Sequence, residues 1–192
     1  VLPYCAELSP AAKQTGSVNT VIRRSDGSLY GDNTDLYGFE AMLKKHRIPV
    51  GKKALVLGSG GVSRSIVAAL RSLGAEEIVT VSRSGEDNYE NLSRHLDAEL
   101  IVNATPVGMY PNNTESLIAP ERFFKLRGVV DAVYNPLRTK LVSDAEALGI
   151  RSCGGLYMLV AQAARSSELF TGERISDERL DGVYAAILNS VQ

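Results

Sequence analysis

The sequence predicts an α/β fold with a parallel sheet, because apolar runs of strand length alternate with amphipathic helices over most of its 192 residues. An apolar run at 53–57 enters a glycine-rich turn and an apolar-periodic helix, and a second strand follows at 78–81. Further strand-like runs stand at 99–102 and 128–134, with a short predicted helix at 88–96 before them. This alternation predicts a doubly wound sheet with helices on both faces.

Local signals predict the flanking elements. Ser9 before Pro10 predicts a capped short helix, and an Asp-Gly turn predicts a hairpin over 18–30. Thr34 opens a helix that runs to about His46. Toward the C-terminus we expect a helix, a short strand and two more helices, at 140–148, 150–152, 156–171 and 177–191. The last helix carries one apolar stripe, formed by Leu180, Val183, Tyr184, Ile187, Leu188 and Val191.

The glycine-rich turn predicts a binding site for the diphosphate of a dinucleotide. Such a site needs backbone N–H groups at a helix N-terminus and a chain without obstructing Cβ atoms. The turn supplies both in the run Gly58, Ser59, Gly60, Gly61 and Val62, and Ser63 takes the third small position of the fingerprint. A tight turn without a ligand is the alternative, but the strand, helix and second strand around it favour a Rossmann-like unit.

The choice of cofactor depends on the end of the second strand, where NAD-binding proteins usually carry an acidic residue. Here the residues are Ser82, Arg83 and Ser84. A guanidinium at this point can pair with a 2′-phosphate, which favours NADP. A solvated arginine is the alternative, and Glu86 and Asp87 nearby leave NAD open.

Composition excludes several classes of function. The formal charge is −1, with 44% hydrophobic and 22% charged residues, and lysine and arginine do not cluster. This argues against nucleic acid or anionic membrane as the main partner. No apolar run reaches transmembrane length and no leader pattern opens the sequence, so we expect a cytoplasmic protein. Cys5 and Cys153 are expected to be reduced thiols, and His46 and His95 to be solvated helix-end residues and not metal ligands.

Six motifs together resemble the shikimate dehydrogenase family, and the resemblance covers the whole chain. They are closer to the enzymes acting on shikimate than to those acting on quinate. The resemblance implies NADPH-dependent reduction of 3-dehydroshikimate to shikimate, an oxidoreductase step of chorismate and aromatic amino acid biosynthesis. It also implies a substrate held between two domains. The motifs are Gly16–Thr20, Gly31–Asp35, Gly58–Arg64, Asn103–Met109, Tyr134–Leu137 and Gly155–Ala163.

The resemblance also implies roles for individual residues. Asp35 would be the catalytic carboxylate that bonds a substrate hydroxyl, Asn19 would hold a second hydroxyl, and Tyr134 and Gln162 would face the substrate. Local alternatives remain. Asp35 could serve the helix dipole, Asn19 could satisfy a neighbouring turn, and Tyr134 could be a half-buried strand aromatic.

Other motif residues would line the cofactor. Gly155, Met158 and Gln162 share one helix face by spacing. In the family, the glycine at the start of this helix lets the nicotinamide ring of the cofactor come close. The family also places the loop around Thr105 and Val107, and Ala132, along the cofactor.

The resemblance divides the chain into three parts. Residues 1–34 would be the remnant of a smaller α/β substrate domain, 35–154 the NADP-binding domain, and 155–192 helices that return to the substrate domain. The family's Asn-Val-Thr-x-Pro-x-Lys motif, with its catalytic lysine, does not occur in these 192 residues, and Lys13 does not replace it. We therefore weigh two hypotheses: the C-terminal part of an oxidoreductase, and a catalytically silent NADP-binding module. The polar set of Asn19, Asp35, Tyr134 and Gln162 favours the first.

We expect the isolated 192-residue chain to bind NADPH with little turnover of shikimate, because a lost acid/base group commonly costs about 10²–10⁴ in rate. Calorimetry with NADPH and a dehydrogenase assay check this, and turnover typical of the family would contradict it.

Apolar faces that the family's missing segment would cover are expected to be bare, and this would favour a homodimer. A monomer in light scattering at high concentration would oppose that expectation.

Overall fold

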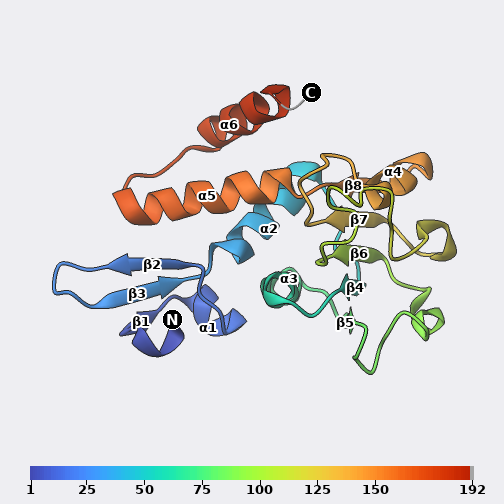
Figure 1. The fold of residues 1–192 in the computed structure, drawn as a ribbon, viewed down its shortest axis with the longest axis horizontal. Helices are drawn as coiled ribbons and strands as arrows, with labels where there is room; N and C mark the ends of the chain where they lie inside the picture. The colour runs from blue at the N-terminus through green and yellow to red at the C-terminus, as the bar shows by residue number, and fades with distance from the viewer. Residues whose placement is uncertain (191–192) are drawn as a thin grey trace.

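The structure, a computed structural model, describes residues 1–190 and contains two sheets joined by long helices (Figure 1). The larger sheet has five parallel strands in the order β5-β4-β6-β7-β8. Because β5 lies outside β4 while β6 continues on its other side, strand order reverses between β4 and β6. The strands are β4 (Lys53–Leu57), β5 (Glu77–Val81), β6 (Leu100–Asn103), β7 (Gly128–Asp131) and β8 (Arg151–Cys153).

Helices cover both faces of this sheet, which confirms the predicted doubly wound fold. On β4, Ala54 and Val56 belong to one apolar cluster and Leu55 and Leu57 to the other, as the two-residue period of a strand requires. The first cluster is covered by α2 (Thr34–His46), α3 (Gly61–Ser72) and α5 (Leu156–Thr171). The second is covered by α4 (Lys140–Ala147) and the short 3₁₀ turns η2 (Leu92–His95) and η3 (Pro120–Arg122).

The smaller sheet contains the predicted hairpin and one strand that the sequence did not reveal. β2 (Thr20–Arg23) pairs antiparallel with β3 (Leu29–Asp32), and β1 (Glu7–Leu8) pairs with β3 in parallel. The 3₁₀ turn η1 (Leu2–Tyr4) precedes them, and α1 (Pro10–Thr15) begins where the Ser9 hydroxyl accepts the Ala12 N–H. This sheet lies beside α5, away from the large sheet (Figure 1).

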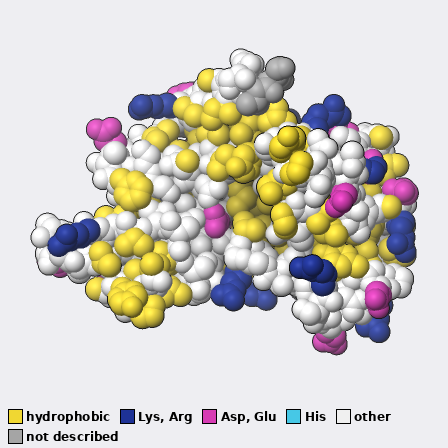
Figure 2. All heavy atoms as spheres, viewed as in Figure 1, with side chains coloured by type: hydrophobic (Ala, Val, Ile, Leu, Met, Phe, Trp, Pro, Cys, Tyr) yellow, Lys and Arg dark blue, Asp and Glu magenta, His cyan; other side chains and the backbone are white. Residues whose placement is uncertain are grey.

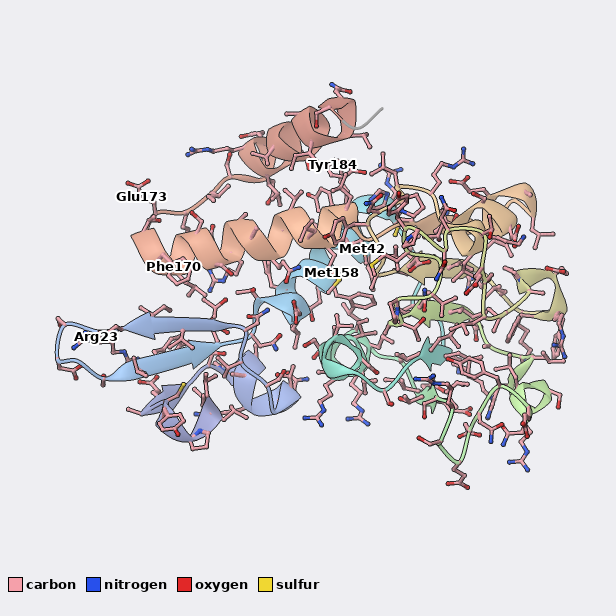
Figure 3. All side chains as sticks on the ribbon, in the orientation of Figure 1. Arg23, Met42, Met158, Phe170, Glu173 and Tyr184 are labelled. Carbon is pink, nitrogen blue, oxygen red and sulfur yellow. The ribbon has the colours of Figure 1, made fainter. Side chains whose placement is uncertain are left out.

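α2 and α5 cross at close range and connect the two halves of the molecule. A Cβ added at Gly38 on α2 would lie 2.7 Å from the carbonyl oxygen of Met158 on α5, so the two backbones almost touch. α6 (Asp177–Ser190) then packs along α5. In Figure 3, Met42 and Met158 lie together near this crossing, and Phe170 and Glu173 mark the far end of α5.

Several expectations need correction. The strand predicted over 128–134 ends at Asp131, so Tyr134 is a loop residue with 48% exposure and not a strand aromatic. The helix predicted over 88–96 is the single turn η2. His46 is not solvated: it packs edge-on against Tyr157 and Tyr184, and burial lowers its pKa.

The apolar stripe of the last helix is only partly bare. Leu180 is buried, and Tyr184, Ile187 and Leu188 pack against the main core, whereas Val183 is 47% exposed. Val191, also assigned to the stripe, lies outside the described residues. Figure 2 shows apolar side chains at the surface over α5 and α6 and on the lobe of the small sheet. Exposed apolar groups of this kind are consistent with the expected homodimer, which stays a prediction.

Among residues 1–190, no helix has the length and apolar character needed to cross a membrane. The same residues contain no cluster of three or more His, Cys, Asp or Glu side chains that could hold a metal ion. Both cysteines are free thiols, with Cys153 buried.

Replacing Phe39 by Ala is expected to lower the free energy of unfolding by about 3–5 kcal/mol. Phe39 lies on the buried face of α2, at 0% exposure, and its loss would leave a cavity. Urea unfolding measures the effect. Phe170→Ala, at a position 62% exposed, is the matched control and should change stability by less than about 0.5 kcal/mol. Equal effects of the two variants would contradict the packing described here.

Candidate active site

Two cavities meet at the carboxyl edge of the large sheet. The first, of about 430 Å³, is here called the glycine-turn cavity, and the second, of about 290 Å³, the Asp35 cavity. They share one wall, formed by Ala104, Thr105 and Pro106 after β6. The shared wall lies where strand order reverses, which is where open α/β sheets bind ligands.

The glycine turn leaves the N-terminus of α3 open. Gly58 has φ +104° and its N–H donates to the Val81 carbonyl at 2.8 Å, and a Cβ there would lie 2.7 Å from the Thr105 Cγ2. Gly60 is the N-cap of α3 and supplies no side chain to cap it. A Cβ at Gly60 or Gly61 would meet nothing within 4 Å among the described residues. Unpaired N–H groups facing open space form a site for an anion.

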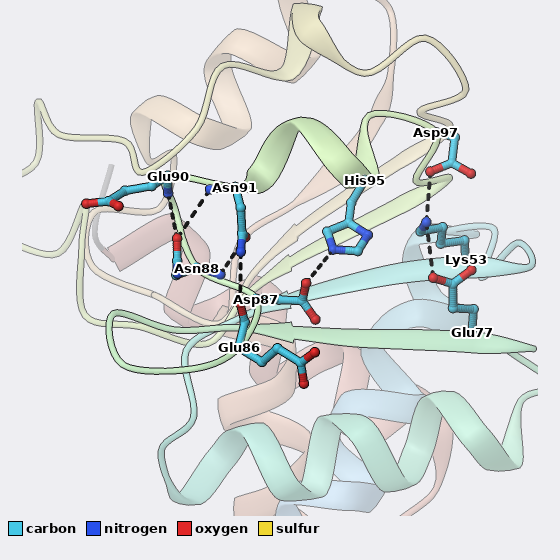
Figure 4. A network of polar contacts seen from close by, with 9 residues as sticks. All are labelled: Lys53, Glu77, Glu86, Asp87, Asn88, Glu90, Asn91, His95 and Asp97. Carbon is cyan, nitrogen blue, oxygen red and sulfur yellow. Dashed lines mark hydrogen bonds and ion pairs between the residues drawn. The ribbon is translucent and has the colours of Figure 1, made fainter.

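The segment after β5 forms the opposite side of the glycine-turn cavity. Ser82, Arg83 and Ser84 line it, together with Tyr89. Two asparagines hold this segment in shape (Figure 4). The Asn88 Oδ1 accepts the N–H groups of Glu90 and Asn91, and the Asn91 side chain donates to the Glu86 carbonyl at 2.8 Å.

The acidic residues of this segment do not line the cavity. The Asp87 carboxylate lies 2.8 Å from the His95 Nε2, and Figure 4 shows the pair. His95 is therefore a partly buried hydrogen-bond partner of Asp87, which corrects its assignment as a solvated residue. Among the described residues that line the glycine-turn cavity, Arg83 is the single charged one. Lys53 bridges Glu77 and Asp97 farther along β4, at the other end of the strand (Figure 4).

Buried hydrogen bonds shape the shared wall. The Asn103 side chain donates to Asp131 at 2.9 Å and accepts from the N–H and hydroxyl of Thr105. Asp131 also accepts the Val133 N–H at 3.0 Å and the Thr139 hydroxyl at 2.7 Å. Its carboxyl is fully buried, which raises its pKa to about 6 despite these donors. Asp131 thereby fixes the loops after β6 and β7 to each other.

Asp35 enters its cavity from the first turn of α2. Asn33 caps this helix by accepting the Leu36 N–H at 3.2 Å. Burial raises the pKa of the Asp35 carboxyl, and a hydrogen bond from the Asn19 side chain opposes the rise. The Asn19 Oδ1 accepts the Thr34 N–H at 2.9 Å, so this asparagine supports the start of α2 beside Asp35.

The start of α5 supplies the facing wall. Gly155, Met158 and Gln162 all line the Asp35 cavity, as do Ala132 and Tyr134 after β7. A Cβ at Gly155 would lie 2.1 Å from the Ala132 carbonyl oxygen. Close packing of the two loops therefore requires glycine here, a reason that helical spacing alone does not reveal.

The structure gathers most of the predicted site residues into these two cavities. Val62 lines the Asp35 cavity, and Ser59 and Val107 line the glycine-turn cavity. Gly61 begins α3 without lining either, and Asn19 lies just outside. Sequence reasoning missed several lining residues, which are distant along the chain or carry no chemical signal. These are Tyr89 and Leu117 in the first cavity and Met109, Val133 and Leu159 in the second.

No protein-family model matches the chain. A curated relative, the shikimate dehydrogenase (NADP(+)) of Clostridium perfringens, is 35% identical over 92% of this chain and 70% of its own length. The chain belongs to the shikimate dehydrogenase family. This family comprises oxidoreductases, and the chain spans about 70% of that relative's length.

Solved structures of the family share the fold. The chorismate mutase/shikimate 5-dehydrogenase fusion protein of Clostridium acetobutylicum superposes with a TM-score of 0.92 at 34% identity, covering 99% of this chain and 74% of that one. The shikimate 5-dehydrogenase of Thermus thermophilus, solved in complex with NADP(H) and shikimate, gives 0.83 at 34% identity over 96% and 74%. The α/β architecture is therefore that of shikimate dehydrogenases.

Two glycines of the turn are expected to differ in their tolerance of alanine. Gly58→Ala should lower the free energy of unfolding by more than about 1 kcal/mol, because φ is +104° and the new Cβ would strike Thr105. Gly60→Ala should stay within about 0.5 kcal/mol, since its φ is −75° and nothing lies within 4 Å. Urea unfolding of both variants checks this, and a reversed order would contradict the turn geometry.

Asp131 should make stability fall as pH rises from about 4 to about 6. The folded pKa of about 6 exceeds the ordinary value of 3.8, so in that interval the folded state keeps a proton that the unfolded state releases. The stabilising contribution, up to about 3 kcal/mol, is complete below the lower pKa and is lost above the higher one. Comparing the urea unfolding of Asp131→Asn with the unmodified chain across this interval should show the slope reduced. Asp144→Asn is the control that should retain it.

Proposed function

We propose that the protein containing this chain reduces 3-dehydroshikimate to shikimate with NADPH, a step in the biosynthesis of chorismate and aromatic amino acids. The shared wall of the two cavities carries this proposal. A dinucleotide whose diphosphate lies on the open turn at Gly60 can extend along Thr105 into the Asp35 cavity. The reacting end of the cofactor would then face Asp35 and Gln162.

Tyr89 and Arg83 support NADP as the cofactor. Tyr89 also lines the glycine-turn cavity, and its aromatic ring can pack against the adenine. The Arg83 guanidinium can pair with a 2′-phosphate without competition from Asp87, which is engaged by His95. The charge of Arg83 and the aromatic ring of Tyr89 together favour NADP as the cofactor of this chain.

The Asp35 cavity offers the groups needed for a polyhydroxylated acid. When bound, the cofactor supplies the hydride. Asp35 accepts a hydrogen bond from a substrate hydroxyl and is the catalytic carboxylate, while the Gln162 amide and Tyr134 hydroxyl orient the ring. Asn19, beside Asp35, is assigned a second hydroxyl. Partial burial of the Asp35 carboxyl strengthens its own hydrogen bond to the substrate, because less water competes for it.

The three-part division of the chain remains part of this proposal. Residues 1–34 contain the small sheet, 35–154 the large one, and 155–192 begin with α5, which contacts both α2 and β2. We assign these parts to the substrate domain, the NADP-binding domain and the returning helices. We further infer that the chain is the C-terminal part of the enzyme, that it forms a homodimer and that it acts in the cytoplasm.

Arg83→Gln should weaken NADPH binding about ten-fold or more and change NADH binding by less than about two-fold. The reason is that only NADPH carries the phosphate that the guanidinium pairs with. Isothermal titration of both nucleotides measures this. Arg94→Gln, an exposed arginine on η2, is the control and should change neither. Equal loss of both nucleotides would exclude Arg83 as the discriminating residue.

Asp35→Asn should lower kcat about 10²–10⁴-fold in the protein containing this chain, with NADPH affinity unchanged. Because burial raises the Asp35 pKa, activity of the unmodified enzyme should rise with pH through that pKa as the carboxylate forms. Glu40→Gln, on the same helix and outside both cavities, should keep full activity. Steady-state kinetics with shikimate and with quinate test the role and the substrate together. NADPH binding without turnover of either substrate would favour the silent module.

A further inference from the structure

A third cavity, of about 390 Å³, lies between α1 and α3 and is here called the α1–α3 cavity. α1 contributes Gln14 and Thr15, and the remaining walls come from the glycine turn, α3 and Thr80 on β5. The Gln14 Nε2 donates to the Ala68 carbonyl at 3.3 Å and to the Ser72 hydroxyl at 3.2 Å, which holds α1 against α3. The cavity therefore contacts both halves of the molecule; it shares no described residue with the Asp35 cavity and adjoins the glycine-turn cavity at Ser59.

Two guanidinium groups line this cavity from one helix face. Arg64 and Arg71 are seven residues apart, which is close to two full turns of α3, so they project from the same side. No carboxylate lines the cavity among the described residues, and within residues 1–190 neither arginine forms an ion pair. The local charge is thus positive and uncompensated.

The Ser63 side chain provides a second, independent observation. Ser63 lines the α1–α3 cavity and is only 3% exposed, yet its hydroxyl has no hydrogen-bond partner within the part of the chain that the structure describes. Serine in a helix commonly bonds back to a carbonyl of the preceding turn, and among the described residues Ser63 does not. A hydroxyl held without a partner beside two guanidiniums is a donor available to a ligand.

We propose that the α1–α3 cavity binds a phosphate dianion through Arg64, Arg71 and the Ser63 hydroxyl. Guanidinium and hydroxyl donors around one concavity match the tetrahedral oxygens of a phosphoryl group. The phosphoryl group has two sources, inorganic phosphate and a phosphate carried by a bound nucleotide. The second source is included because Ser59 lines both this cavity and the glycine-turn cavity.

Titration of the chain with inorganic phosphate, followed by ³¹P NMR and calorimetry, tests the site without any nucleotide. Binding should weaken about ten-fold or more in Arg64→Gln and in Arg71→Gln, and less strongly in Ser63→Ala. Arg122→Gln, an exposed arginine on η3, is the matched control and should bind phosphate as the unmodified chain does. Both arginines are exposed, so thermal melting should show that the variants fold.

Parallel titrations with NADPH and NADH distinguish the two sources. Weaker binding of both NADPH and NADH in Arg64→Gln assigns the phosphoryl group to the diphosphate that the two nucleotides share, because the 2′-phosphate is assigned to Arg83 in the other cavity. Loss of inorganic phosphate binding with both nucleotides unaffected assigns it to the free anion. Unchanged binding of phosphate and of NADPH in both arginine variants overturns the proposal. Because the phosphate titration needs no nucleotide, its result is independent of the proposed dehydrogenase function.

Discussion

The close crossing of α2 and α5 is the constraint on which the rest of the site depends. Gly38 has no Cβ, and one added there would lie 2.7 Å from the Met158 carbonyl oxygen and 3.1 Å from the Gln162 Cβ. Asp35 stands three residues before Gly38, about one helical turn away and on the same side of α2. Contact between the two backbones thus sets the separation of Asp35 and Gln162 across the cavity. A larger residue at position 38 would separate these two walls while leaving each helix intact.

A second constraint is polar and lies at the other side of the crevice. Asp131 is buried at the end of β7, and its three hydrogen-bond donors come from Asn103, Val133 and Thr139. Desolvation of this carboxyl is costly, and the donors offset that cost only in part, as the raised pKa indicates. These hydrogen bonds hold the loop that both cavities share in one conformation. Polar burial here stabilises one loop conformation, and its contribution to overall stability changes with pH because the carboxyl is protonated more readily in the folded chain.

Sequence reasoning succeeded where local chemistry determines structure. The Ser9 cap, the helix beginning at Thr34 and the strand, turn and helix around Gly58 all follow from short-range signals, and the structure contains each. The misses depend on tertiary contacts. β1 has two residues and exists only through pairing with β3, and the environment of His46 depends on aromatic rings far along the chain. Tyr89 likewise joins the site because asparagine side chains fold its segment back toward the crevice.

Ala104, Thr105 and Pro106 belong to both principal cavities, and this has a consequence for changing the specificity of the protein. Any substitution in that shared stretch alters the surroundings of two ligands at once. Selection for a new substrate at these positions would therefore also change how the cofactor binds. A residue that lines one cavity alone can be substituted without changing the lining of the other cavity. Tyr89 is such a position on one side and Gln162 on the other. Directed evolution of the substrate or the cofactor preference should therefore begin at residues outside the shared wall.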